Sequence, residues 1–134
     1  MILKVRHAMV KPVTVNAKET VLEAARKMIQ ENQRYLVVLQ GNELRGVVDL
    51  YKVFRYTYSP GFRPQQTPIG ELVDENIVLA RPETSLEDAL TIMVESNCDA
   101  LPVVDEGLVG VVDIYGVLKA QPKARPKEKP VYMA

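Results

Sequence analysis

The stretch that decides the fold is Leu44-Arg45-Gly46-Val47-Val48-Asp49-Leu50-Tyr51-Lys52-Val53, because it recurs. The same pattern returns 64 residues later as Leu108-Val109-Gly110-Val111-Val112-Asp113-Ile114-Tyr115-Gly116-Val117. Leu, Gly, Val, Val, Asp, Tyr and Val stand in the same order in both stretches, with no gap. An internal repeat of this kind predicts two copies of one structural unit. We therefore expect any functional site to lie between the copies.

The composition is that of a soluble globular protein, with 134 residues, 47% of them hydrophobic and 25% charged. The formal net charge of zero argues against a general nucleic-acid binder, which needs a basic face. Cys98 is the single cysteine, so an internal disulfide cannot form. No apolar run reaches the ~18 residues of a membrane helix. The first residues are too soon interrupted by charge for a secretory signal. We expect a cytoplasmic protein.

The first copy predicts the order strand, helix, strand, strand, helix. Residues 13–15 form a short β-branched run, and residues 20–23 form an S/T-x-x-E capping box that opens a helix. Residues 36–39 predict a buried strand, 44–48 a returning strand, and Asp49 the start of a helix that ends near Tyr56. The apolar face of the first helix is predicted to be Leu22, Ala25, Met28 and Ile29.

The second copy repeats this order after a linker at residues 58–64, which contains two prolines and a glycine. A gap-free alignment of residues 13–55 with 77–119 predicts a strand at Ile77-Val78-Leu79 and a capping box at Thr84-Ser85-Leu86-Glu87. Pro102 cannot donate to a ladder, so it should be the first residue of its strand or lie on an edge. The apolar helix face is predicted to be Leu86, Ala89, Leu90, Met93 and Val94.

The chain therefore divides into a first repeat with its lead-in and linker at 1–62, a second repeat at 63–121 and a tail at 122–134. The tail alternates proline with charge, which predicts a flexible segment. One repeat is too small to cover its own sheet. We therefore expect an α/β (α+β) fold in which two β-α-β-β-α repeats pack sheet against sheet around a pseudo-two-fold axis.

The chain resembles a tandem pair of cystathionine-β-synthase-type (CBS) domains from His7 to Ala120. Residues 99–105, Asp-Ala-Leu-Pro-Val-Val-Asp, match the inner-strand motif of that family. Residues 111–115 resemble a stretch in the gamma subunit of AMP-activated protein kinase, and residues 7–15 resemble the usual opening of a repeat. The first inner strand has Val37-Val38 where the family has Pro-Val.

The resemblance implies a regulatory module with two clefts between the repeats. Members often bind adenosine-containing ligands such as AMP, ADP, ATP or S-adenosylmethionine and pass the bound state to a partner protein, and they commonly pair into disc-like homodimers. The adenine nucleotide would be a regulatory ligand, with no obligatory cofactor. Such modules are seldom enzymes, and the chain shows no paired carboxylates, Ser–His or Cys–His pattern, or metal-spaced cluster.

The resemblance also assigns residues to the clefts. One cleft would use Val13, Thr14, Arg34, Tyr35 and Leu36 with Asp113 and Gly116. The other would use Ile77, Val78, Cys98, Asp99 and Ala100 with Asp49 and Lys52. Phosphate would be met by Arg34, Lys11 or Arg81.

Two features leave alternatives open. Ligand-binding members usually place a ribose-binding Asp three residues after the end of the last strand, where this chain has Lys52 and Gly116. In the register of the gamma subunit the residues at that position are Arg55 and Lys119, so neither register supplies the Asp. Lysine only donates hydrogen bonds, so it cannot accept them from a ribose diol, although it can meet a phosphate. Asp49 and Asp113 could accept ribose hydroxyls, cap the helices that follow them, or do both. The alternative function is a ligand-free module for dimerisation and protein interaction.

Overall fold

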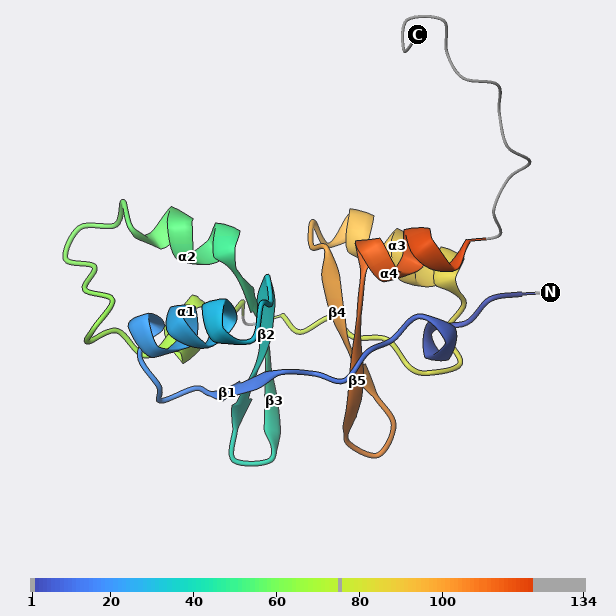
Figure 1. The fold of residues 1–134 in the computed structure, drawn as a ribbon, viewed down its shortest axis with the longest axis horizontal. Coiled ribbons are helices and arrows are strands. Elements are labelled where there is room, and N and C mark those ends of the chain that lie inside the picture. The colour runs from blue at the N-terminus through green and yellow to red at the C-terminus, as the bar shows by residue number, and fades with distance from the viewer. Residues whose placement is uncertain (1, 75, 122–134) are drawn as a thin grey trace, which may run out of the picture.

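The computed structural model describes residues 2–74 and 76–121, so the predicted tail at 122–134 lies outside the described residues. The chain forms two halves that stand side by side, with helices on one side and hairpin turns on the other (Figure 1). Their elements are, in order, η1 (Val5–His7), β1 (Thr14–Asn16), α1 (Val21–Gln30), β2 (Tyr35–Gln40), β3 (Glu43–Asp49), α2 (Leu50–Tyr56), η2 (Ile69–Leu72), α3 (Leu86–Glu95), β4 (Ala100–Val104), β5 (Leu108–Asp113) and α4 (Ile114–Ala120).

The first half contains the predicted order of strand, helix, strand, strand, helix. β1 pairs in parallel with β2, and β2 pairs antiparallel with β3. The turn between β2 and β3 places Gly41 at φ 62°, a conformation that glycine adopts without steric cost. Of the run predicted to be buried, Leu36, Val37 and Val38 are buried and Leu39 is partly buried; Tyr35, which precedes the run, is buried too.

The second half lacks the strand predicted at Ile77-Val78-Leu79. β4 and β5 form a two-stranded sheet, and only Ala80 bridges to β4, opposite Val103. In the first half the Val37 N–H donates to the Val13 carbonyl at 2.9 Å. The residue in the place of Val37 is Pro102, which has no N–H to donate. β4 is an edge strand, and Pro102 is its third residue. The prediction that Pro102 lies on an edge is therefore correct, and the alternative that it is the first residue of its strand is wrong.

The capping box predicted at Thr84 is also wrong. Thr20 caps α1 by accepting a hydrogen bond from the Glu23 N–H, but α3 is capped by Ser85, which accepts from the Asp88 N–H at 3.0 Å. The second helix thus starts one residue later than the gap-free alignment requires. From the pair Ala100–Asp113, the second hairpin is one residue shorter than the first hairpin from its equivalent pair Tyr35–Asp49, and this restores the alignment by the end of β5.

This shift, together with the neighbours of each helix, changes the predicted apolar faces. The buried residues are Val21, Ala24 and Met28 in α1, and Leu86, Ala89 and Met93 in α3. Ile29 and Val94 are instead 78% and 71% exposed. Only Met28, Leu86, Ala89 and Met93 of the predicted faces are fully buried. In the first half, β2 and η2 lie on the side of α1 that carries Val21, so α1 buries that side.

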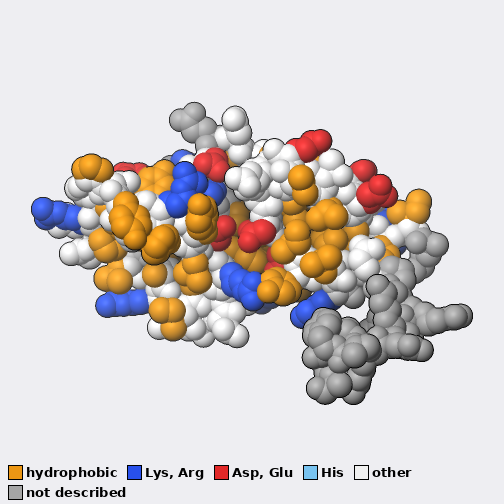
Figure 2. Space-filling model, turned by 90° about the horizontal axis from the view of Figure 1, so that it is seen from above, with side chains coloured by type: hydrophobic (Ala, Val, Ile, Leu, Met, Phe, Trp, Pro, Cys, Tyr) orange, Lys and Arg blue, Asp and Glu red, His pale blue; other side chains and the backbone are white. Residues whose placement is uncertain are grey.

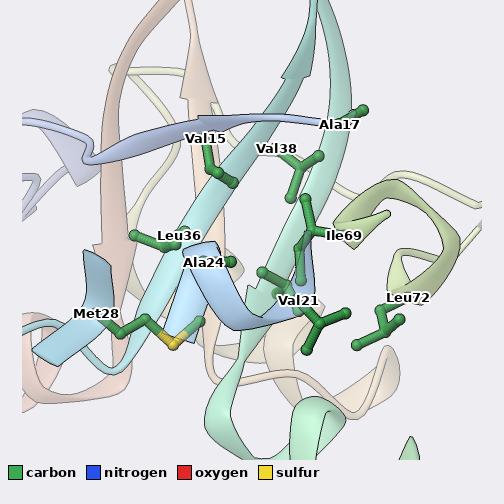
Figure 3. Close-up of a cluster of buried hydrophobic side chains, with 10 residues drawn as sticks. Val15, Ala17, Val21, Ala24, Met28, Leu36, Val38, Ile69 and Leu72 are labelled. Carbon is green, nitrogen blue, oxygen red and sulfur yellow. The ribbon is translucent and has the colours of Figure 1, made fainter. Parts of the chain in front are cut away.

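The two halves exchange their lead-in segments. The N-terminal segment crosses from the second half to β1 in the first (Figure 1). The Val5 N–H donates to Thr84 at 2.7 Å, and the Val5 side chain is buried in the second core with Leu86 and Met93. Ile69 and Leu72 of η2 complete the first core beside Val21 (Figure 3). Each half is therefore built from two separate stretches of sequence.

A third buried cluster lies where the two sheets meet. It contains Tyr35 and Val37 from β2, Ala100 from β4 and Val111 from β5. This cluster confirms that the sheets pack together, as the repeat pattern predicted. Within the described residues, none of the helices has the length and apolar character needed to cross a membrane.

Candidate functional site

A cavity of about 690 Å³ lies between the two halves. Its walls come from β3 and α2 of the first half and from residues 76–78 and 96–102 of the second. Acidic and basic side chains gather where the halves meet, between hydrophobic patches (Figure 2). The lining includes every residue of the second cleft predicted from the family resemblance, namely Asp49, Lys52, Ile77, Val78, Cys98, Asp99 and Ala100.

Asp49 sits at the junction of β3 and α2, where the chain turns from extended to helical. Its φ and ψ of −124° and 174° are extended, and its Oδ1 accepts the Lys52 N–H at 2.8 Å. This confirms the predicted N-cap. Among the described residues, none donates a hydrogen bond to the other oxygen of Asp49. The second oxygen is therefore available to a ligand.

Lys52 follows one turn later and is held by two acceptors. Its Nζ donates to the Val47 carbonyl at 3.2 Å and to Asp74 Oδ2 at 3.0 Å. The Asp74 side chain is 77% exposed, so this ion pair is solvated and weak. An anionic ligand could compete with Asp74 for the ammonium group.

The opposite wall of the cavity carries Cys98 and Asp99. Partial burial and repulsion from Asp49 and Asp113 raise the pKa of the Asp99 carboxyl. Burial also raises the pKa of the Cys98 thiol, which therefore stays protonated at neutral pH. The described residues contain no group of three or more His, Cys, Asp or Glu arranged to hold a metal ion.

The other predicted cleft contains side chains that bind one another. The Tyr35 hydroxyl donates to Asp113 Oδ2 at 2.7 Å, and Asp113 Oδ1 accepts the Gly116 N–H at 2.7 Å. The Arg34 guanidinium lies 4.3 Å from the centre of the Tyr115 ring. Asp113 is thus an N-cap, as predicted, and each of its oxygens already accepts one hydrogen bond.

The remaining predicted residues lie away from the open cavity. Leu36 is fully buried in the first core, and Val13 packs against that core. Thr14 begins β1, and its carbonyl accepts from Lys27. Lys11 and Arg81 are exposed.

Several cavity residues were missed by the sequence reasoning. They include Tyr51, Asp74, Asn76, Ser96 and Asn97. Tyr51 belongs to the repeated motif and lies one helical turn before Arg55 on α2. This spacing puts the two side chains on one face of the helix, and it could have assigned Tyr51 to the site. Arg55 also lines the cavity and lies 5.7 Å from the Tyr51 ring centre. The loop residues carried no repeated pattern, so only the fold brings them to the site.

Comparison with known proteins gives one consistent family match. The CBS domain model matches twice, at residues 5–59 and 69–123. The CBS domain-containing protein YhcV of Bacillus subtilis is 35% identical over 100 residues, which cover 74% of this chain and 71% of the relative. Longer curated relatives also match, of which the chain spans 24% and 13%.

Solved structures share the fold. An uncharacterised conserved protein from Pyrococcus horikoshii superposes with a TM-score of 0.80 at 24% identity, covering 96% of this chain and 98% of that one. The CBS domain pair of protein MJ0100, in complex with 5′-methylthioadenosine and S-adenosyl-L-methionine, superposes with a TM-score of 0.78 at 21% identity, covering 89% and 95%. At these identities the likeness concerns the fold alone.

Proposed function

The chain belongs to the CBS-domain family, and on that premise we propose that it is a regulatory module that binds an adenosine-containing ligand between its repeats. The ligand class is AMP, ADP, ATP or S-adenosylmethionine. Binding of the ligand is signalled to a partner protein that contacts the module. The module performs no reaction of its own in this proposal.

The observation that carries the proposal is the cavity of about 690 Å³ at the junction of the halves. It is lined by every residue that the family resemblance assigned to one cleft. The volume lies in the range of about 300–1,000 Å³ that is typical of small-molecule sites. A fold neighbour whose structure contains S-adenosyl-L-methionine adds support for the ligand class.

The cavity walls suit the parts of an adenosine ligand. Ile77, Val78 and Ala100 offer apolar surface for the adenine ring. Across from them, the free Asp49 oxygen can accept a hydrogen bond from a ribose hydroxyl, a role that the lysine at position 52 cannot fill. Lys52 and Arg55 can meet a phosphate, because the solvated pair with Asp74 is easily exchanged.

Calorimetric titration with each of the four ligands tests this proposal. We expect one of them to bind, and Asp49→Asn to weaken that binding by about tenfold, since asparagine keeps the helix cap but loses the charged acceptor. Asp105→Asn is the matched control, because it removes the same charge at a residue that is exposed in the β4–β5 turn. Absence of heat and of any thermal shift with all four ligands at millimolar concentration would refute the proposal.

We also propose that the helical side of the molecule binds a second copy of the chain. Exposed apolar side chains occur there in pairs related by the pseudo-two-fold axis, namely Ile29 with Val94, Tyr51 with Tyr115 and Phe54 with Leu118. Hydrophobic patches cover this side in Figure 2. A two-fold dimer buries the same patch on both partners. Exposed apolar patches of this kind mark interaction sites.

A further inference from the structure

The two predicted clefts differ in what faces their carboxylates: Asp49 lines the cavity, whereas Asp113 accepts the Tyr35 hydroxyl. We infer that the module takes one ligand per chain, in the cavity at Asp49, because Tyr35 occupies the corresponding position of the other cleft. This inference rests on the proposed function and adds the stoichiometry and the residue that sets it.

The strand register identifies the corresponding residues. Tyr35 pairs with Asp49 at the start of the first hairpin, and Ala100 pairs with Asp113 at the start of the second. Tyr35 and Ala100 are thus equivalent by the pseudo-two-fold axis. Tyr35 is 8% exposed and contributes a ring to the contact between the sheets, whereas Ala100 contributes one methyl group. The smaller residue faces the open cavity.

The two equivalent carboxylates differ in what remains for a ligand. Asp113 uses one oxygen to cap α4 and the other to accept the Tyr35 hydroxyl. Asp49 uses one oxygen to cap α2, and the described residues leave the other unbonded. A ribose hydroxyl at Asp113 would have to share an oxygen that already accepts a hydrogen bond, beside the Tyr35 ring. At Asp49 the same hydroxyl would meet a free acceptor.

Two further contacts distinguish the Tyr35 side from the open cavity. Arg34 stacks over Tyr115 at 4.3 Å, whereas the residue equivalent to Arg34 is Asp99, which lines the open cavity. The lead-in segment also packs against α4, since a Cβ at Gly116 would lie 3.0 Å from the Ala8 carbonyl oxygen. The backbone is therefore close-packed at the position where the open cleft has the long side chain of Lys52.

The only cysteine of the chain distinguishes the clefts experimentally. Cys98 lines the open cavity and is partly buried, so its reaction with a maleimide reports occupancy of that cleft alone. We expect AMP or S-adenosylmethionine to titrate to about one ligand per chain. At a concentration of about ten times Kd, the same ligand should slow Cys98 labelling by about tenfold.

Ala100→Tyr places the blocking ring in the open cleft. We expect it to weaken binding by at least about tenfold, while circular dichroism confirms that the variant is folded. The wild-type measurement needs no variant and decides the matter if Ala100→Tyr does not fold. Two ligands per chain, or one ligand that leaves Cys98 labelling unchanged, would overturn the inference while the proposed function stands. Absence of binding by the wild-type chain would overturn both.

Discussion

Replacing Val5 with alanine tests the exchange of lead-in segments between the halves. Val5 stands at the start of the first CBS match in sequence, yet its side chain is 0% exposed within the core of the second half. The substitution removes two buried methyl groups, each worth about 0.8 kcal/mol in transfer free energy, and leaves a small cavity. We expect the free energy of unfolding to fall by about 2 to 3 kcal/mol.

Equilibrium unfolding in urea measures this loss, and the methionine methyl resonances locate it. Met93 lies in the same buried cluster as Val5, and Met28 is its counterpart in the first half. We expect the Met93 signal to shift and the Met28 signal to stay. Val10→Ala is the matched control, because Val10 belongs to the same lead-in but is 54% exposed. A loss below about 0.5 kcal/mol, or a shift confined to Met28, would refute the exchange.

Three further substitutions test the helix register, the contact between the repeats and the helical face. Ser85→Ala should lower the free energy of unfolding by about 1 kcal/mol in urea titrations, because it removes the cap of α3; no loss would contradict the revised register. Burial and the hydrogen bond to Asp113 raise the pKa of Tyr35. The wild-type protein should therefore lose stability as the pH rises above about 10, where the unfolded tyrosine ionises first, and Tyr35→Phe should flatten this fall; parallel curves would contradict the buried phenol. Phe54→Asp should dissociate the proposed dimer in sedimentation experiments, while Val109→Asp, on an exposed strand position, should not; equal behaviour of the two variants would contradict the helical interface.

The repeated motif allowed most of the fold to be predicted. Gly-Val-Val-Asp combines a buried strand with a helix cap, and local sequence determines both features. Asp49 and Asp113 accordingly cap α2 and α4. The sheet-to-sheet packing followed from the small size of one repeat, and the cluster around Val37 and Val111 confirms it.

The errors arose where local patterns had two solutions. Thr84 and Ser85 are both good N-caps, and the gap-free alignment favoured the wrong one. Residues 77–79 have side chains suited to a strand, but no strand forms there, because Pro102 has no backbone N–H to donate to it. The spacing of Ile29 places it on an apolar helical face, but α1 buries Val21, Ala24 and Met28 and leaves Ile29 exposed.

Long-range arrangements could not be predicted from these patterns. The lead-in exchange brings Val5 and Leu86 together, and no local signal relates such distant positions. The closure of one cleft depends on the pairing of Tyr35 with Asp113 across the repeats. Both residues were assigned to a cleft by the family resemblance, but only their positions in the fold show that they bind each other.

The most direct test of the central claim is a titration of the ¹⁵N-labelled chain with AMP and with S-adenosylmethionine, followed by amide chemical shifts. We expect the largest changes at residues 49–52, 76–78 and 97–100, which surround the open cavity. Amides of Tyr35 and Gly116 at the closed cleft should change little. Largest changes at the closed cleft, or no saturable change with either ligand, would contradict binding in the cavity at Asp49.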